Sequence, residues 1–319
     1  MSDFLESSWT SAETSDDGPA LVALGDRLYI AWVGSGNDHL NVMPSVDLPN
    51  GVVGFDSGAK LVIDRSHSDE VGSLGGPALA ANPDGYLYLG WTHNGGGIFG
   101  QGGAQSMFAL IFDEGLQQRG ELSSLDTSDD GPAMTYWVEG NRLNTAWRGS
   151  GNTNLNVMHD MDPFTKHTSD EISDHRPALC TGRFPSFTIY MAWTGVDNRE
   201  LNVMSCVNEN PFVGEQADPT IFDSNTKEIY PDATSPSAPA IATLGKGLYL
   251  VWQGDNDHLY LKSDSLAGLG RNDARGSEQR TKHHPAVAAF RDRLFVAWTG
   301  TDDHLNLAQV APEWDTRLP

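Results

Sequence analysis

Long apolar runs, basic side chains and cysteines are all scarce in this chain of 319 residues. No stretch approaches the roughly 18 apolar residues that a membrane-spanning helix needs, so we expect no membrane insertion. Asp and Glu number 43 against 20 Lys and Arg, and the formal charge of −23 argues against nucleic-acid binding through a basic surface. We interpret this charge as a source of solubility. Calcium binding, a cationic partner and a salty habitat are the alternatives.

The two cysteines, Cys180 and Cys206, are too few for a disulfide framework, and we expect both to be free thiols. Residues 1–8 contain neither the basic region nor the apolar run of a signal peptide. A cytoplasmic protein and the mature form of a secreted protein both agree with this pattern. The sequence therefore predicts neither a compartment nor an oligomeric state.

Internal repetition is the strongest signal in the chain. A Pro-Ala pair occurs six times, and one tryptophan follows each pair. In five of the six units a glycine stands two residues after the tryptophan, and a leucine stands seven or eight residues after it. The prolines are Pro19, Pro77, Pro132, Pro177, Pro239 and Pro285, and the tryptophans are Trp32, Trp91, Trp147, Trp193, Trp252 and Trp298.

The spacing of the pairs, 45 to 62 residues, predicts the fold. Repeats of roughly 40–50 residues with four strands each are typical of propeller blades. We predict an all-β chain that forms one six-bladed β-propeller domain over residues 1–319, with units that start near residues 15, 73, 128, 173, 235 and 281. The last unit lacks a fourth strand, whereas residues 4–10 precede the first unit. We therefore expect an N-terminal strand to complete the last blade and close the ring.

The repeated motif carries a resemblance to known proteins. The unit Gly-Pro-Ala-Leu, then Leu-Tyr-x-Ala-Trp-x-Gly, then Asp-His-Leu-Asn-Val resembles the blade repeat of lectin-like propeller proteins from bacteria and fungi. The resemblance covers nearly the whole chain and implies the propeller fold and glycan binding. The Asp-box of sialidases and the WD, kelch and NHL signatures are absent from the sequence, so no site residue is carried over from a family.

The segment before each Pro-Ala pair provides the first group of candidate site residues. A Ser or Thr stands four residues before each proline, and we interpret it as a structural residue that bonds the turn backbone. The positions after it vary: Asp or His stands two residues after it in four units, and Gly75 and Ser237 stand there in the other two. Because first strands line the channel of a propeller, we expect these variable residues to face a common central cavity and to be candidate catalytic residues. Neutral drift on a solvated rim is the alternative. The candidates are Asp17, Asp130, His175, Arg176, His283 and His284.

The turn after each tryptophan provides the second group. Antiparallel neighbouring strands place this turn at the same blade edge as the segment before Pro-Ala. A sugar site needs an aromatic ring for stacking and short polar side chains for the hydroxyl groups. The structural alternative is that Asn and Asp form the turn and that tryptophan packs between blades. The candidates are Trp32, Asp38, His39, Trp147, Asn154, Trp193, Asn198, Trp252, Asp257, His258, Trp298, Asp303 and His304.

Three functional hypotheses follow. The first is a carbohydrate-binding, lectin-like propeller with several quasi-equivalent sites on one face. The second is an enzyme with a single pocket over the central channel that acts on a glycan or a small metabolite. The glycine-rich loop at residues 95–103 is then a lid over this pocket, and the alternative is that it belongs to an eroded blade. The third is a protein-interaction scaffold. We expect a glycan or another small molecule as the partner and no cofactor. No metal-binding spacing occurs, and Ca²⁺ is the alternative that the carboxylates leave open.

Overall fold

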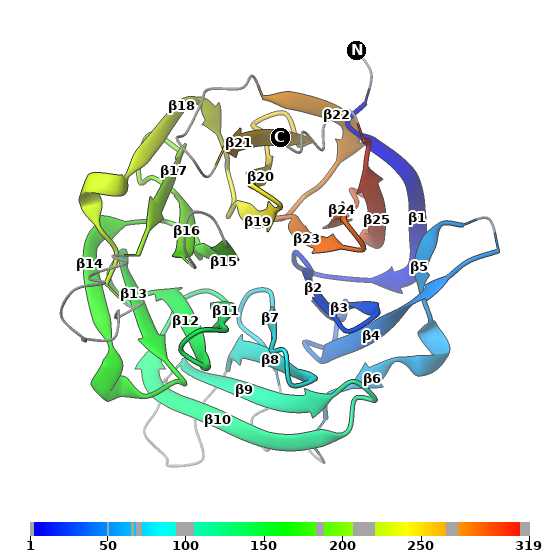
Figure 1. The fold of residues 1–319 in the computed structure, drawn as a ribbon, viewed down its shortest axis with the longest axis horizontal. Coiled ribbons are helices and arrows are strands. Elements are labelled where there is room, and N and C mark those ends of the chain that lie inside the picture. Colours follow the sequence, from blue (N-terminus) through cyan, green and yellow to red (C-terminus); the bar gives the residue numbers. More distant parts are fainter. Residues whose placement is uncertain are drawn as a thin grey trace.

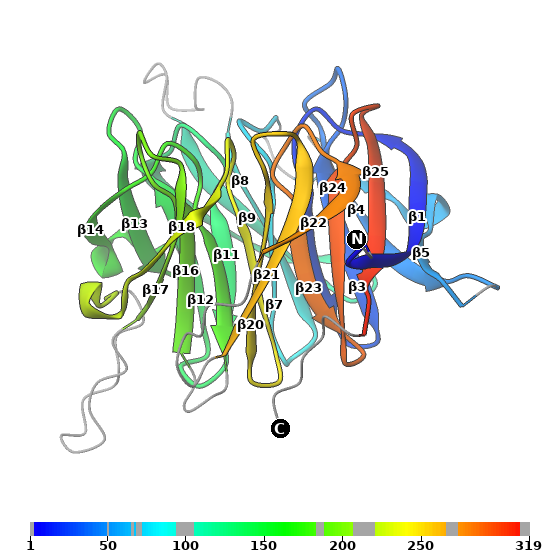
Figure 2. The same cartoon turned by 90° about the horizontal axis from the view of Figure 1, so that it is seen from above.

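The computed structural model describes residues 3–49, 51–64, 67, 72–93, 105–182, 188–206, 221–265 and 274–312. Six antiparallel sheets form a ring, which confirms the predicted six-bladed β-propeller (Figure 1). In the view from above, the strands of the sheets run from one face of the ring to the other (Figure 2). Within these ranges, no helix has the length and apolar character needed to cross a bilayer.

The blades follow one another along the chain. Blade 1 contains β2 (Ala20–Leu24), β3 (Arg27–Val33), β4 (Leu40–Asp47) and β5 (Val53–Phe55), with β6 (Leu61–Val62) also paired to β4. Blade 2 contains β7 (Ala78–Ala81), β8 (Tyr86–Thr92), β9 (Ser106–Asp113) and β10 (Gln118–Thr127). Blade 3 contains β11 (Ala133–Trp137), β12 (Arg142–Arg148), β13 (Asn154–His159) and β14 (His167–Ile172).

The second half of the ring repeats this order. Blade 4 contains β15 (Ala178–Gly182), β16 (Thr188–Thr194), β17 (Glu200–Ser205) and β18 (Glu228–Thr234). Blade 5 contains β19 (Ala240–Leu244), β20 (Gly247–Gln253), β21 (His258–Ser265) and β22 (Arg275–Arg280). Blade 6 contains β23 (Ala286–Phe290), β24 (Arg293–Thr299), β25 (His304–Val310) and β1 (Leu5–Thr14).

Blade 6 joins the two ends of the chain, as the sequence predicted. Strand β1 pairs antiparallel with β25, with Leu5 opposite Val310 and Thr10 opposite Asn306. Phe4, which precedes the strand, is fully buried in the hydrophobic cluster between blades 5 and 6. The N-terminal strand thus covers the edge that β25 would otherwise expose.

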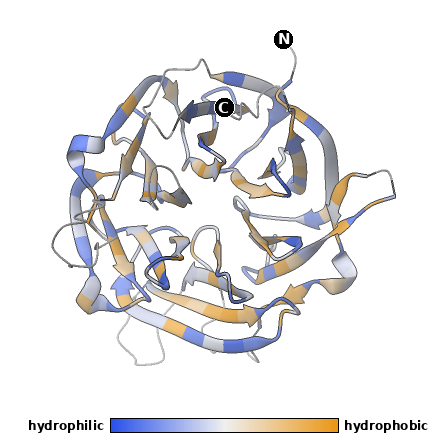
Figure 3. Ribbon diagram, viewed as in Figure 1, coloured by the Kyte–Doolittle hydropathy of each residue, from blue (hydrophilic) through white to orange (hydrophobic). Residues whose placement is uncertain are grey.

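The first strand of each blade is the innermost one, and the fourth faces outwards (Figure 1). The outer strands are the more hydrophilic, as in blade 2, where β10 is largely exposed and β9 is largely buried (Figure 3). Each hydrophobic cluster is shared by two adjacent blades. Trp32, for example, packs in one cluster with Phe295 and Leu305 of blade 6. The core therefore lies between the blades, around the ring.

The recurring Ser or Thr ties neighbouring blades together. In blade 4, Oγ of Ser173 lies 2.8 Å from the carbonyl oxygen of His175 and 2.9 Å from that of Thr194. The backbone N–H of Ser173 donates to the carbonyl of Thr153, in the turn of blade 3, at 2.9 Å. Thr281 makes the same three contacts in blade 6. These bonds support the structural interpretation of this position.

Candidate functional site

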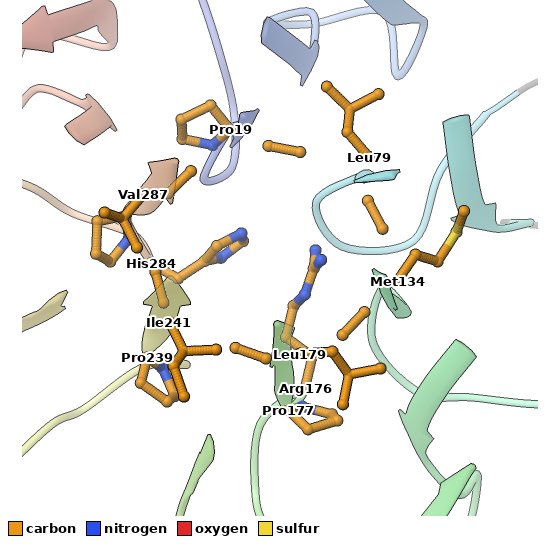
Figure 4. A pocket seen from close by; sticks show the side chains of 17 residues that line it. Pro19, Leu79, Met134, Arg176, Pro177, Leu179, Pro239, Ile241, His284 and Val287 are labelled. Carbon is orange, nitrogen blue, oxygen red and sulfur yellow. The ribbon is translucent and has the colours of Figure 1, made fainter. Parts of the chain in front are cut away.

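The structure places the six central candidates near one mouth of the channel, but two of the six, and not all as we expected, line the cavity there. Arg176 and His284 directly precede a Pro-Ala pair and line a cavity in the middle of the ring, where their side chains extend inwards (Figure 4). Both are buried, with exposed fractions of 7% and 9%. The other four residues, one position earlier in their units, are half-buried around them: Asp17, Asp130, His175 and His283.

Asp17 contacts the two histidines of blade 6. Its Oδ1 lies 3.5 Å from Nδ1 of His284 and 3.8 Å from Nδ1 of His283, and it accepts a hydrogen bond from the N–H of Gly18 at 2.6 Å. Burial raises the pKa of the Asp17 carboxyl, and the Gly18 hydrogen bond opposes that shift. Burial also lowers the pKa of His284 well below its usual range, so this imidazole is neutral near pH 7.

Arg176 extends across the channel from blade 4. Its Nη1 donates to the carbonyls of Gly76 and Pro77 in blade 2, at 2.6 and 2.9 Å. A Cβ on Gly131 would lie 2.0 Å from the Gly76 oxygen and 2.8 Å from Nη1 of Arg176. A Cβ on Gly76 would lie 2.7 Å from the His284 ring. The glycines of blades 2 and 3 thus leave room for the two large side chains that fill the mouth.

Two adjoining cavities lie along the channel. The smaller, about 80 Å³, contacts Arg176 and His284, and the larger, about 220 Å³, is lined by the inner strands. Five residues of the inner strands, one from each of blades 2 to 6, contribute to the walls of both cavities, and their side chains also belong to the hydrophobic clusters between blades: Leu79, Met134, Leu179, Ile241 and Val287. Across the described ranges, no group of three or more His, Cys, Asp or Glu is placed to hold a metal ion. The glycine-rich loop at residues 95–103 lies outside the described residues.

The tryptophans of the repeat do not offer ring faces to a ligand. All six are 2% exposed or less and lie among buried residues of the blades. Our expectation that Trp32, Trp147, Trp193, Trp252 and Trp298 could stack directly on a sugar is therefore wrong. A tryptophan beside a polar turn can also pack between blades. The structure shows this second arrangement. Of this second group of candidates, the polar residues of the turns are therefore the ones that a ligand could reach.

The turns themselves have a structural explanation. Asp38, Asp257 and Asp303 have positive φ angles of 56°, 65° and 68°, a conformation that Asp and Asn tolerate in tight turns. The preceding residue caps the turn, as where Oδ1 of Asn256 accepts from the N–H of His258. The carbonyl of Asp257 then accepts from the next blade. The side chain of Asp38 is exposed, whereas that of Asp303 pairs with Lys282 at 2.7 Å.

The other turn candidates are also placed by local bonds. Oδ1 of Asn198 accepts from the N–H of Glu200, and Nδ2 of Asn154 donates to the carbonyl of Ser169. His39 and His304 are half-buried beside their turns. These five blade turns recur on one face of the ring, but side-chain bonds engage much of their polar surface.

A lysine covers the buried tryptophan in two blades. Nζ of Lys166 lies 5.3 Å from the centre of the Trp147 ring, and Nζ of Lys227 lies 5.4 Å from that of Trp193. Lys227 also pairs with Glu171 of the preceding blade at 2.5 Å. In these blades the lysine fills the space above the tryptophan and joins two blades at their outer edge.

An aromatic ring takes this place in blades 2 and 5. Phe108 stacks on Trp91 with ring centres 5.7 Å apart, and Tyr260 stacks on Trp252 at 5.6 Å and 20°. Tyr260 stands where four other units have Asn after the recurring Leu. Nδ2 of Asn256 donates to the Tyr260 hydroxyl at 3.0 Å, which fixes the ring next to the turn.

A cavity of about 170 Å³ opens beside Tyr260, and sequence reasoning did not identify it. His258 Nδ1 lies 2.7 Å from the carbonyl oxygen of Ser277. Because a carbonyl only accepts, Nδ1 carries the proton, and Nε2 of the neutral ring is an acceptor. Asp3 Oδ2 accepts from Ser277 Oγ at 3.0 Å. The lining residues are Asp3, Asn256, His258, Tyr260, Gly276, Ser277 and Glu278.

Comparison with known proteins agrees on the architecture. No protein-family model and no curated protein matches the sequence. Among solved structures, a Hadza microbial sialidase has a TM-score of 0.64 at 10% identity, over 94% of this chain and 66% of that one. The SapL1 lectin in complex with alpha methyl fucoside has a TM-score of 0.57 at 13% identity, over 90% and 89%.

Trypanosoma rangeli sialidase in complex with the inhibitor DANA has a TM-score of 0.58 at 9% identity, over 97% of this chain and 60% of that one. The chain thus spans two thirds or less of both sialidases. At these identities the likeness establishes the propeller fold, and the neighbours that share it include a lectin and sialidases.

Proposed function

We propose that this protein is a carbohydrate-binding, lectin-like propeller that binds sugars on the face that carries the turns after the tryptophans. The observation that supports this best is the cavity of blade 5, where Tyr260 stacks on Trp252 and borders a space lined by polar groups. An aromatic ring beside hydrogen-bonding side chains is the combination that a sugar ring requires.

The chemistry of this cavity favours a neutral sugar. The carboxylates of Asp3 and Glu278 and Nε2 of His258 are acceptors, and sugar hydroxyl groups can donate to them. The formal charge of −23 and these two carboxylates disfavour an acidic sugar. The bonds of Asp3 to Ser277 and of Asn256 to Tyr260 hold the cavity in place before a ligand arrives.

The repeated turns extend this proposal to several quasi-equivalent sites. Each turn shares a blade edge with the segment before the next Pro-Ala pair, and exposed polar atoms such as the Asp38 carboxylate lie there. A single shallow site of this kind binds weakly, at about −4 kcal/mol, or roughly millimolar. Several linked sites raise the strength of binding to a multivalent glycan without new contacts.

The test is binding of a panel of neutral monosaccharides to the full chain, measured by saturation-transfer NMR, and of multivalent neutral glycans on an array. We expect Tyr260→Ala to lose at least tenfold in affinity and Tyr260→Phe to retain binding, because the ring face remains. Tyr86→Ala, a change of an exposed tyrosine in blade 2, is the control. Absence of binding to every neutral glycan, or unchanged binding by Tyr260→Ala, would refute the proposal.

A further inference from the structure

The side chain of Asp3 joins the N-terminal segment to the outer strand of blade 5. Its Oδ2 accepts hydrogen bonds from Oγ of Ser277 at 3.0 Å and from the backbone N–H of Glu278 at 3.1 Å, both in β22. Its Oδ1 accepts from the backbone N–H of Leu5, the first residue of β1, at 3.0 Å. The start of β1 thus lies next to β22 (Figures 1 and 2). One carboxylate therefore binds both the closing strand of blade 6 and the edge strand of blade 5.

Ser277 continues these bonds into the cavity of blade 5. Its hydroxyl donates to Asp3, and its carbonyl oxygen lies 2.7 Å from Nδ1 of His258. That carbonyl keeps the proton on Nδ1 and leaves Nε2 of the neutral ring as an acceptor. Asp3, Ser277 and His258 all line the cavity. A continuous series of hydrogen bonds thus runs from β1 to the polar wall of the proposed sugar site.

The position of Asp3 depends on ring closure. Phe4, the next residue, is fully buried in the hydrophobic cluster between blades 5 and 6, and its carbonyl accepts from the N–H of Ala311 at 2.9 Å. Strand β1 pairs with β25 from Leu5 onwards. When β1 leaves β25, Asp3 loses its anchor, and the cavity loses one wall and two hydrogen bonds that hold β22. In the described part of the chain, Asp3 is the one residue of this segment that lines the cavity.

We propose that sugar binding in the blade 5 cavity is coupled to ring closure, with Asp3 as the positioning residue that joins the two. This inference rests on the proposed function, because its ligand is the sugar proposed for that cavity. A sugar that needs Asp3 in place binds the closed ring alone, so bound sugar stabilises the pairing of β1 with β25. The coupling is reciprocal, so loosening of β1 weakens sugar binding.

Hydrogen exchange of β1 tests the coupling. The backbone amides of residues 5–14 are followed by mass spectrometry in the full chain carrying Phe4→Ala, in which β1 opens more often. The ligands are the methyl glycosides of galactose, glucose, mannose and fucose. For a glycoside at ten times its Kd, we expect β1 exchange to slow about tenfold, because the open ring does not bind it. Residues 118–127, in the outer strand of blade 2, are the control and should exchange at an unchanged rate.

If Phe4→Ala does not fold, Leu5→Ala gives the same reading, because Leu5 is only partly buried against the same cluster. Neither side chain lines the cavity as described, so both changes act on it through the position of the segment. Unchanged exchange of β1 at saturating glycoside would overturn the proposal.

Variants of Asp3 identify the connecting residue. Asp3→Ala should weaken glycoside binding at least fivefold and remove the effect of the glycoside on β1 exchange. Asp3→Asn, which keeps one acceptor oxygen, should weaken binding less. Asp26→Ala, an exposed residue in the turn between β2 and β3, is the control and should change neither measurement. Binding by Asp3→Ala as tight as that of the wild type would refute the role of Asp3.

The two proposals fail in different ways. If none of the four glycosides binds the wild type, the proposed sugar site is refuted and the coupling falls with it. If a glycoside binds and Tyr260→Ala loses it, but β1 exchange stays the same, the sugar site stands and the coupling alone is refuted.

Discussion

Oγ1 of Thr299 donates a hydrogen bond of 2.7 Å to the backbone carbonyl of Asp17, 282 positions earlier in the chain. The same bond links Thr92 to Asp130 and Thr194 to Ser237 in other blades. In these three blades, the Thr after the tryptophan thus holds the segment that enters the next blade. The bond from Thr299 shows that the contact between the last blade and the first uses the same hydrogen bond as contacts between blades that are consecutive in the sequence.

Loss of the N-terminal closure should destabilise the whole ring. We expect Phe4→Ala to lower the free energy of unfolding by about 3–5 kcal/mol, because it leaves a cavity in the hydrophobic cluster between blades 5 and 6. Chemical denaturation measures the change. Ser8→Ala, in the exposed part of β1, is the control and should change little. Equal stability of the two variants would argue against closure by this segment.

The hydroxyl ties should each contribute to stability. Ser173→Ala removes the side-chain bonds to His175 and Thr194 from a fully buried position, and we expect a loss of about 1–3 kcal/mol. Thermal melting of this variant is compared with that of Ser35→Ala, an exposed serine. A melting temperature equal to that of the control would show that the recurring hydroxyl has another role.

Acid should weaken the fold through His284. Its pKa in the folded protein lies well below the value of about 6.5 in an unfolded chain. Below about pH 6.5 the unfolded state therefore binds a proton that the folded state does not bind, and the free energy of unfolding falls as the pH drops. We expect the loss of stability between pH 7 and pH 5.5 to be smaller in His284→Gln than in the wild type. His39→Gln, beside a blade turn, is the control, and an equal loss in all three proteins would contradict this prediction.

The cysteines should be unreactive in the native protein. Cys180 and Cys206 are buried free thiols, as the sequence predicted, and burial raises the pKa of Cys180. A thiol reagent such as Ellman's should modify neither before unfolding and both in denaturant. Reductant should leave the melting temperature unchanged. Fast labelling of the native protein would show that this part of blade 4 opens readily.

Multivalent binding should depend on several turns together. Under the proposed function, Asp38→Ala alone should barely change binding to a multivalent glycan. The triple variant of Asp38, Asp257 and Asp303 to Ala should reduce it steeply, because three sites are weakened. The measurement is binding of the full chain and of each variant to a glycan immobilised on a surface. A triple variant that binds like the wild type would leave these turns with a structural role alone.

The repeat predicted the fold because each unit has the same strands, and the position of β1 followed from counting strands at both ends. Burial of the tryptophans was harder to predict, since a ring at a strand end beside a polar turn can face a ligand or a neighbouring blade. Tyr260 is detectable only as a departure from the Leu-Asn pattern. Its cavity depends on Asp3 and Ser277, which lie 274 positions apart, and sequence spacing does not reveal that contact.

The sequence analysis also did not predict that Lys166 and Lys227 lie over buried tryptophans, although a sequence pattern accompanies them. Segments of the form Asp-x-x-x-Lys occur at residues 56–60, 162–166 and 223–227. In each, the Asp side chain accepts from the N–H two residues later and caps a short 3₁₀ turn. Spacing identifies the turn, but only the structure shows that the lysine reaches a tryptophan.

The pairing of β1 with β25 also sets the order of folding during synthesis. β1 leaves the ribosome before the other strands of the propeller, and its partner follows about 300 residues later. Until then β1 lacks its hydrogen-bonded partner strand, while the five complete blades can assemble in sequence. Contacts over such separations form slowly, and unpaired edges promote aggregation. We therefore expect ring closure to be a late step of folding, and the chain to be most prone to aggregation before it.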